Sequence, residues 1–306
     1  MKRPIPYRRI GALCLLTALA QPAIAQDDPV TFSGSVSAGI GSDSNVGIPE
    51  LDQTTGEGDL SYLFSLEGYV EADASERLTL RAGYELSHTG YQDFDQFSLQ
   101  THRGSLEAVY DFHVVEAGVL YNYVHARLDS EGYLNYQQIS PYVTHLAGDR
   151  VFLRGALEFT DKDFQTDDAR DAEGQGLRGD VYYFIDGASQ YVSLTGRVRE
   201  EDANSDLFDF TGMSVDARYN QDFTVLDRSA ELRIGGGYES REYDGVDPLI
   251  SDARSDDILS AQTGLEFELA GPLALDVDYS YRDRQSNLPS ADYDEHVAEL
   301  RLRASF

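Results

Sequence analysis

The chain has 306 residues with 54 acidic and 24 basic side chains, which gives a formal net charge of −30. This surplus of negative charge excludes a protein that binds the phosphate backbone of nucleic acids, because such proteins present a basic face. The one cysteine, Cys14, falls in an N-terminal leader, so we expect the remainder to fold without disulfides or thiolate chemistry.

Residues 1–25 have the three parts of a secretory signal peptide. Basic side chains precede an apolar run at residues 10–20, and the small residues Ala23 and Ala25 form a cleavage site. The run is too short for a membrane-spanning helix, which needs about 20 residues, and no later stretch is apolar enough for one. We predict a signal peptide at residues 1–25 and a mature chain at 26–306 that enters a membrane only by strands.

Fourteen stretches of the mature chain alternate apolar and polar residues with the period of two that a β-strand requires. In the first stretch, Phe32 and Val36 share one face, and Ser33 and Ser35 share the other. Such rows predict strands with lipid on one side and a polar lumen on the other. The stretches cover about residues 31–41, 60–74, 77–91, 98–110, 113–128, 133–146, 150–164, 174–185, 190–201, 208–220, 228–242, 259–268, 275–282 and 296–306.

The connections between these stretches alternate in length. Short ones fall near residues 75–76, 111–112, 148–149, 186–187, 222–227 and 271–272, and longer polar ones at 42–59, 92–97, 129–132, 165–173, 202–206, 243–254 and 285–293. A soluble sandwich, which also has alternating strands, gives no reason for sorting loops in this way. We therefore predict an all-β fold, a single 14-stranded antiparallel transmembrane β-barrel at residues 26–306, in outer-membrane lipid with both termini periplasmic.

The polar rows carry both signs of charge and predict the lining of the lumen. The basic members are Arg81, Arg103, Arg154, Arg178, Arg197, Arg199, Arg218, Arg233, Arg301 and Arg303. The acidic members are Glu67, Glu85, Glu158, Asp180, Asp216, Glu231, Glu266, Asp276 and Glu299. Two interpretations stay open: a solute path with a transverse electric field, or a lattice of ion pairs that keeps a wide barrel round.

The residues form no catalytic set and no metal site. The six histidines are scattered along the sequence, and His88 has carboxylates only at Asp93 and Asp95, as is expected in so acidic a chain. Residues 202–206 begin like a calcium loop, but Leu207 and Met213 occupy the positions that need Gly and Glu. We predict that the chain is not an enzyme and has no cofactor.

The last strand ends the chain on Phe306, with Leu300 and Leu302 on one face and Arg301 and Arg303 on the other. This ending resembles the terminal strand of Gram-negative outer-membrane barrels. The resemblance implies that Phe306 is an assembly signal for the barrel assembly machinery.

Three further stretches are similar to the carboxyl-terminal barrel of the surface lipoprotein assembly modifier family. They are residues 41–46 (GSDSNV), Ser140-Pro141, and residues 281–289 (YRDRQSNLP) followed by Asp292-Tyr293. Family members that export lipoproteins carry a periplasmic tetratricopeptide-repeat domain before the barrel, whereas here the first strand follows the leader within a few residues. The resemblance implies an export pore or its barrel-only relative, with a surface lipoprotein or a periplasmic repeat-domain protein as partner.

The residues by themselves allow two other functions. A polar lumen suits a passive diffusion porin for small solutes, and the acidic loops suit a barrel that works through surface interactions.

Overall fold

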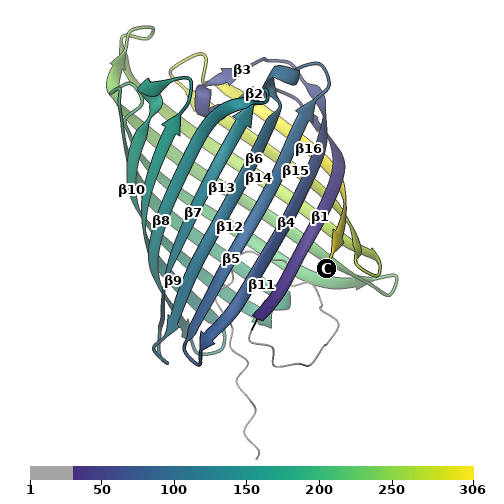
Figure 1. The fold of residues 1–306 in the computed structure, drawn as a ribbon. Coiled ribbons are helices and arrows are strands. Elements are labelled where there is room, and N and C mark those ends of the chain that lie inside the picture. The colour runs from purple at the N-terminus through teal and green to yellow at the C-terminus, as the bar shows by residue number, and fades with distance from the viewer. Residues whose placement is uncertain (1–29) are drawn as a thin grey trace, which may run out of the picture.

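The computed structural model describes residues 30–306, which form one closed antiparallel barrel of fourteen tilted strands (Figure 1). The predicted fold class is confirmed; the predicted signal peptide lies outside the described residues. Among residues 30–306, no helix is long and apolar enough to cross a membrane. The barrel strands are β1 (Val30–Asp43), β4 (Asp59–Ser75), β5 (Leu78–Tyr91), β6 (Leu99–Asp111), β7 (Glu116–Leu128), β8 (Glu131–Ala147), β9 (Val151–Phe164), β10 (Ala172–Asp186), β11 (Gln190–Ala203), β12 (Phe210–Val225), β13 (Arg228–Asp247), β14 (Asp252–Ala270), β15 (Leu273–Ser286) and β16 (Tyr293–Ser305).

The barrel closes where the first and last strands pair. The β1–β16 ladder runs from Ser35 opposite Ser305 to Asp43 opposite Val297, and Phe306 exchanges two backbone hydrogen bonds of 2.9 Å with Gly34. A Cβ atom on residue 34 would lie 2.8 Å from the Phe306 ring, so glycine makes room for the terminal aromatic side chain. Closure leaves the fourteen barrel strands within residues 30–306 without an unpaired edge, which a hydrocarbon environment would not tolerate.

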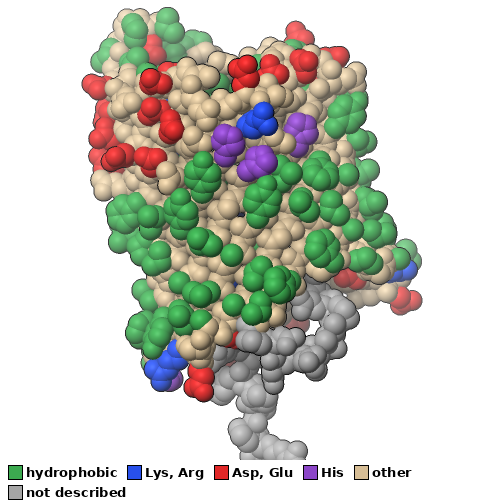
Figure 2. Space-filling view, viewed as in Figure 1, with side chains coloured by type: hydrophobic (Ala, Val, Ile, Leu, Met, Phe, Trp, Pro, Cys, Tyr) green, Lys and Arg blue, Asp and Glu red, His purple; other side chains and the backbone are tan. Residues whose placement is uncertain are grey.

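Apolar side chains cover the outside of the barrel. Phe32 is 72% exposed, Leu177 61% and Met213 60%, whereas the inward Asp180 is 2% exposed. Figure 2 shows these apolar side chains as a belt around the middle of the visible face, with acidic side chains near one rim. A belt of this extent would be unfavourable in water and matches the requirement of a lipid-facing surface.

The two ends of the barrel differ in their connections. The short-turn end holds the turns at residues 76–77, 112–115, 148–150, 187–189, 226–227 and 271–272, together with Val30 and Phe306. The long-loop end holds the connections at 44–58, 92–98, 129–130, 165–171, 204–209, 248–251 and 287–292. Three of these long-loop connections contain short 3-10 helices: η1 (Pro49–Leu51), η2 (Asp95–Phe97) and η3 (Asp168–Arg170). A fourth, η4 (Gly187–Ser189), forms a turn at the short-turn end.

Three predicted connections are shorter than the sequence suggested. The predicted loop at 129–132 is a two-residue turn in which Asp129 and Ser130 both have positive φ, as tight hairpins require. The ladder of β12 and β13 continues to Val225 opposite Arg228, and β13 and β14 extend to Asp247 and from Asp252. At the long-loop end, β13 and β14 continue into residues such as Asp244, Asp247, Asp252 and Ser255, where the apolar–polar alternation that marks a strand is lost.

Candidate functional site

The longest connection, residues 44–58, folds across the barrel opening at the long-loop end, and we call it the mouth segment. It contains the small strands β2 (Gly47–Ile48) and β3 (Gln53–Thr54) with η1 between them. Asp52 follows η1 in the left-handed conformation (φ 54°), and its backbone N–H donates to the Pro49 carbonyl. Hydrogen bonds between Val46 and both Glu57 and Thr55, of 3.0 and 2.9 Å, hold the segment in a compact hairpin.

On one wall the mouth segment is held by apolar packing. Ile48, only 4% exposed, lies in a cluster with Ala126 on β7, Tyr133 on β8 and Phe164 on β9. Leu51 packs against the same cluster. Burying an aliphatic side chain of this size contributes about 1.5–3 kcal/mol, so this contact anchors the segment to β7, β8 and β9.

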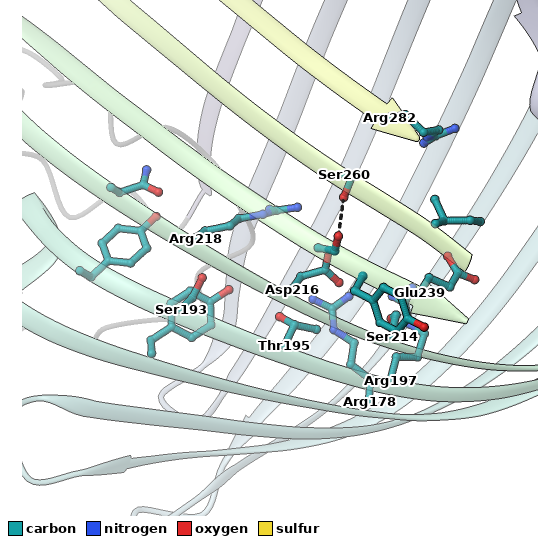
Figure 3. A pocket seen from close by; sticks show the side chains of 16 residues that line it. Arg178, Ser193, Thr195, Arg197, Ser214, Asp216, Arg218, Glu239, Ser260 and Arg282 are labelled. Carbon is teal, nitrogen blue, oxygen red and sulfur yellow. Dashed lines mark hydrogen bonds between the residues drawn. The ribbon is translucent and has the colours of Figure 1, made fainter. Parts of the chain in front are cut away.

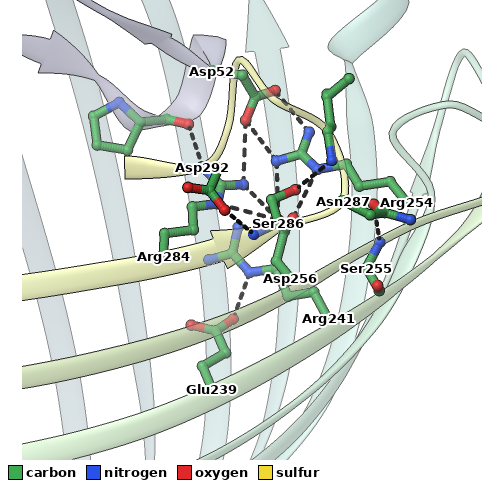
Figure 4. Close-up of polar contacts among 12 residues, drawn as sticks. Asp52, Glu239, Arg241, Arg254, Ser255, Asp256, Arg284, Ser286, Asn287 and Asp292 are labelled. Carbon is green, nitrogen blue, oxygen red and sulfur yellow. Dashed lines mark hydrogen bonds and ion pairs between the residues drawn. The ribbon is translucent and has the colours of Figure 1, made fainter. Parts of the chain in front are cut away.

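On the opposite wall the mouth segment is held by ion pairs (Figure 4). Asp52 Oδ1 lies 2.8 Å from Arg254 Nη2 on β14 and 3.2 Å from Arg284 Nη2 on β15. Both arginines also bind Asp256, whose side chain is fully buried. From the connection between β9 and β10, Arg170 of η3 also binds Asp52 Oδ2 at 3.1 Å and donates a hydrogen bond of 2.8 Å to the Glu50 carbonyl. We call Asp52, Asp256, Arg170, Arg254 and Arg284 the latch.

The strand order shows that these two anchors face each other. In a ring of fourteen strands, β8 and β15 are seven positions apart, as are β7 and β14. The mouth segment therefore spans the lumen from wall to wall.

The charges of the latch fix the ionisation of Asp52. Burial alone would raise the pKa of this carboxyl, but the Arg254 hydrogen bond and the charges of Arg254, Arg284 and Arg170 outweigh it. The pKa of Asp52 is therefore lowered from the ordinary value of 3.8. The carboxylate is ionised, and the latch is charged, across the physiological pH range.

A passage of about 210 Å³ remains between the mouth segment and the wall of β9 to β15, and we call it the eyelet. Basic groups outnumber acidic ones around it. The basic side chains are Lys162, Arg170, Arg199, Arg241, Arg254, Arg282 and Arg284, and the acidic ones are Glu50, Asp52, Glu201 and Glu239. The eyelet thus has a surplus of positive charge, even when the buried Asp256 that pairs with Arg254 and Arg284 is counted, although the chain as a whole is strongly acidic.

Aromatic rings hold several of the eyelet guanidinium groups in place. Arg170 lies 4.0 Å above the centre of the Phe208 ring, and Arg254 lies 4.5 Å above that of Tyr243. Arg199 and Arg241 both stack on Phe210, at 4.9 and 5.2 Å. A stacked guanidinium keeps its N–H donors at its edge, where they can meet a passing anion.

Beneath the eyelet the lumen continues as a series of polar cavities that share walls. A central cavity of about 320 Å³ shares Glu239 and Arg282 with the eyelet (Figure 3). It shares Arg178 and Tyr182 with a cavity of about 730 Å³ that reaches the short-turn end at Arg77. The three cavities therefore adjoin one another between the long-loop end and the short-turn end, and the eyelet has the smallest volume of the three.

The structure places most of the predicted lumen residues in ion pairs along the wall. The pairs are Arg81 with Glu71 and Glu107, Arg103 with Glu85, Arg178 with Asp180, Arg197 with Glu158, Arg199 with Glu239, Arg233 with Glu231, Glu266 and Asp278, Arg301 with Glu299, and Arg303 with Glu266 and Asp276.

Four predicted residues are outside this lattice. Glu67 accepts a hydrogen bond of 3.4 Å from Ser35, and Arg154 stacks 4.0 Å above the Tyr142 ring. Arg218 and Asp216 line the central cavity, and within residues 30–306 neither forms an ion pair. The walls of the lumen thus carry a lattice of ion pairs, and Arg218 and Asp216 at the central cavity lie outside it.

Sequence reasoning missed the latch. Asp52 and Arg254 fell in stretches predicted as loops, and Arg284 belonged to a motif without a predicted partner. The signal that pointed to them was the length of the 42–59 connection and the presence of Pro49 within it, which starts η1.

Two of the three stretches similar to the lipoprotein assembly modifiers meet at this mouth. Asn45 donates a hydrogen bond of 3.1 Å to the Asp294 carbonyl and accepts one of 2.9 Å from Gly56, which ties the mouth segment to β16. The 281–289 stretch supplies Arg282 and Arg284 to the eyelet. The third, Ser140-Pro141, interrupts the β8–β9 ladder, whose pairs resume at Tyr142 opposite Ala156.

Residues 148–306 match the sequence profile of the outer membrane protein beta-barrel domain. The chain belongs to that family. This barrel, whose apolar face points outward, is accordingly an outer-membrane protein, as predicted. The match is to outer-membrane barrels in general and does not distinguish the lipoprotein assembly modifiers among them.

Solved structures show the same fold for this outer-membrane barrel. OmpT, an outer membrane protein of Vibrio cholerae, aligns over 93% of this chain and 100% of its own with a TM-score of 0.53 and 11% identity. An anion-selective porin from Comamonas acidovorans aligns over 90% and 99%, with a TM-score of 0.52 and 10% identity. No curated protein sequence matches the chain significantly. At these identities the similarity concerns the fold alone.

Proposed function

We propose that this barrel is a diffusion channel of the outer membrane that prefers small anionic solutes. The observation that carries the proposal is the eyelet, which is lined by seven basic and four acidic side chains and has the smallest volume of the three lumen cavities described above. The narrowest point of a pore has the largest effect on which ions pass, because a solute there is closest to the wall charges. We assign the chain no catalytic step.

The magnitude follows from Coulomb's law. One uncompensated positive charge about 6 Å from an anion contributes about 3 kcal/mol at an effective dielectric constant of about 20. Salt and water in the lumen screen this interaction. We therefore expect an anion preference on the order of tenfold.

We further propose that the short-turn end and both termini face the periplasm, so that the mouth segment lies at the outer surface. Short periplasmic turns and longer external loops are the arrangement of bacterial outer-membrane barrels. Phe306, at the short-turn end and paired with Gly34, is then available to the barrel assembly machinery before the barrel closes.

The test is the reversal potential of the purified full chain in a planar bilayer under a potassium chloride gradient. We expect the sign that corresponds to anion preference. Arg282→Gln should reduce the preference several-fold, because Arg282 lines both the eyelet and the central cavity. Arg150→Gln, an exposed arginine at the short-turn end, should leave it unchanged. A cation preference in the unaltered protein contradicts the proposal.

A second candidate is an exporter similar to the surface lipoprotein assembly modifiers. It is favoured by the convergence of residues 41–46 and 281–289 on the mouth. A polypeptide could pass only after the mouth segment had left the lumen. Bilayers containing the isolated barrel should then show no steady conductance, whereas the diffusion channel conducts with the mouth segment in place.

A further inference from the structure

Four side chains that are scattered in the sequence meet on the outer face of the barrel near its long-loop end. They are His88 on β5, His102 on β6, and His125 and Arg127 on β7, and we call them the histidine patch. In the strand register His102 lies opposite His125, and Gln100 lies opposite both His88 and Arg127. Figure 2 shows histidines gathered with one basic side chain just above the apolar belt.

Hydrogen bonds fix the His102 and His125 side chains at the boundary of the apolar belt. The hydroxyl of Tyr84, an outward side chain 44% exposed, lies 2.7 Å from His102 Nδ1. His125 Nδ1 lies 2.8 Å from Asn135 Oδ1, and the two imidazole rings are 6.3 Å apart. Since each ring uses Nδ1 for these contacts, Nε2 of both rings has no hydrogen-bond partner in the described part of the chain.

Arg127 is the permanent charge of the patch. Its guanidinium donates to the side-chain oxygen of Gln100 at 3.4 Å and to the backbone carbonyl of Ser130. Among residues 30–306, no carboxylate lies within ion-pair distance of it. Neighbouring outward positions on β9 to β11, such as Asp161, Asp163 and Glu200, are acidic, so the patch differs in charge from the surface beside it.

The level of the patch on the barrel indicates its ligand. Tyr84 and Tyr123, 44% and 38% exposed, mark the membrane interface, where tyrosine rings gather. Below them, Leu106 and Val119 are 59% and 47% exposed and face the hydrocarbon. A cationic group directly above such a surface lies at the depth of lipid head groups, and guanidinium and imidazolium are good donors to phosphate.

We propose that the histidine patch binds the phosphate group of an anionic lipid whose acyl chains lie along β5 to β7. Under the orientation proposed above, this lipid belongs to the outer leaflet. Arg127 pairs with the phosphate, His102 and His125 donate from Nε2 when protonated, and the Tyr84 side chain supports the His102 ring. The inference does not depend on which solutes the lumen passes.

The test is native mass spectrometry of the full chain in detergent at pH 6 with two probes. One is bisphosphorylated lipid A, and the other is the same lipid with both phosphates removed. The unaltered protein should retain the phosphorylated probe about tenfold more strongly. Arg127→Gln and the double variant His102→Gln with His125→Gln should each reduce this preference toward equality, and Arg127→Lys should restore part of it. Arg228→Gln, at the short-turn end, should change nothing.

Several outcomes overturn the proposal. Equal retention of both probes by the unaltered protein removes it, and so does an effect of Arg228→Gln as large as that of Arg127→Gln. Displacement of the phosphorylated lipid by inorganic phosphate alone would show a free-anion site instead. Folding of each variant is scored by its heat-dependent mobility in gels; a variant that does not fold leaves the other variant and the two-probe comparison to decide. The ion preference of Arg282→Gln is measured separately, so failure of one proposal is not failure of the other.

Discussion

Asp52→Asn should open the mouth of the barrel. The change keeps the size of the side chain and removes the charge that pairs with Arg254 at 2.8 Å, Arg170 at 3.1 Å and Arg284 at 3.2 Å. Removing one partner of a buried ion pair costs about 3–5 kcal/mol. We take the lower value, because Arg254 and Arg284 keep Asp256 at 2.9 and 2.7 Å. About 3 kcal/mol shifts the ratio of displaced to seated mouth segment by roughly 150-fold.

Single-channel recording in planar bilayers measures this shift. We expect long openings of larger conductance in Asp52→Asn and few in the unaltered protein. Asp167→Asn is the matched control, because Asp167 pairs with the same Arg170 at 3.2 Å but its side chain is 42% exposed. An exposed pair contributes at most about 1 kcal/mol, so the control should change the ratio no more than about fivefold. Unchanged conductance in Asp52→Asn, or an equal change in both variants, would refute the role of the latch.

Three other predictions follow from the same structure. Because the pKa of Asp52 is lowered from 3.8, its charge stabilises the seated mouth segment above that pH, and this stabilisation is lost as the pH falls through the folded-state pKa. Conductance recorded against pH should therefore stay constant from about pH 8 to 5 and rise only in acid below 3.8. The Asp52→Asn variant should show no such rise. Ile48→Ala should destabilise the apolar anchor by about 2–4 kcal/mol and increase the cleavage of residues 44–58 by added protease, whereas Leu249→Ala, at a side chain 82% exposed, should not. Leu265→Arg on the lipid face should lower the free energy of unfolding, measured by refolding into lipid vesicles, by about 2–4 kcal/mol. Arg218→Gln in the lumen should lower it much less, because Arg218 has no ion pair among the described residues. A reversed order of the two variants would contradict the assignment of faces.

The alternation of side chains determined much of this protein by itself. A period of two is a local property of the backbone, so Phe32, Leu177 and Met213 were placed on the outer face without knowledge of any partner strand. The number of strands and the parity of the connections followed from the same pattern. The pattern failed where its physical cause ends: β13 and β14 continue past the apolar belt into residues predicted as a loop, because lipid no longer selects for alternation there.

Only the tertiary structure decided the mouth segment, the eyelet and the histidine patch. Asp52 and Arg254 are 202 residues apart in the chain, and Asp52 and Arg170 are 118 apart. No local pattern encodes such pairs, because barrel closure and strand register decide which walls face each other. The same register brings His102 beside His125 on neighbouring strands, although the sequence shows only scattered histidines. Periodicity therefore predicts whether a side chain points to the lipid or to the lumen. The partners of a lumen side chain on the opposite wall are decided only when the barrel closes.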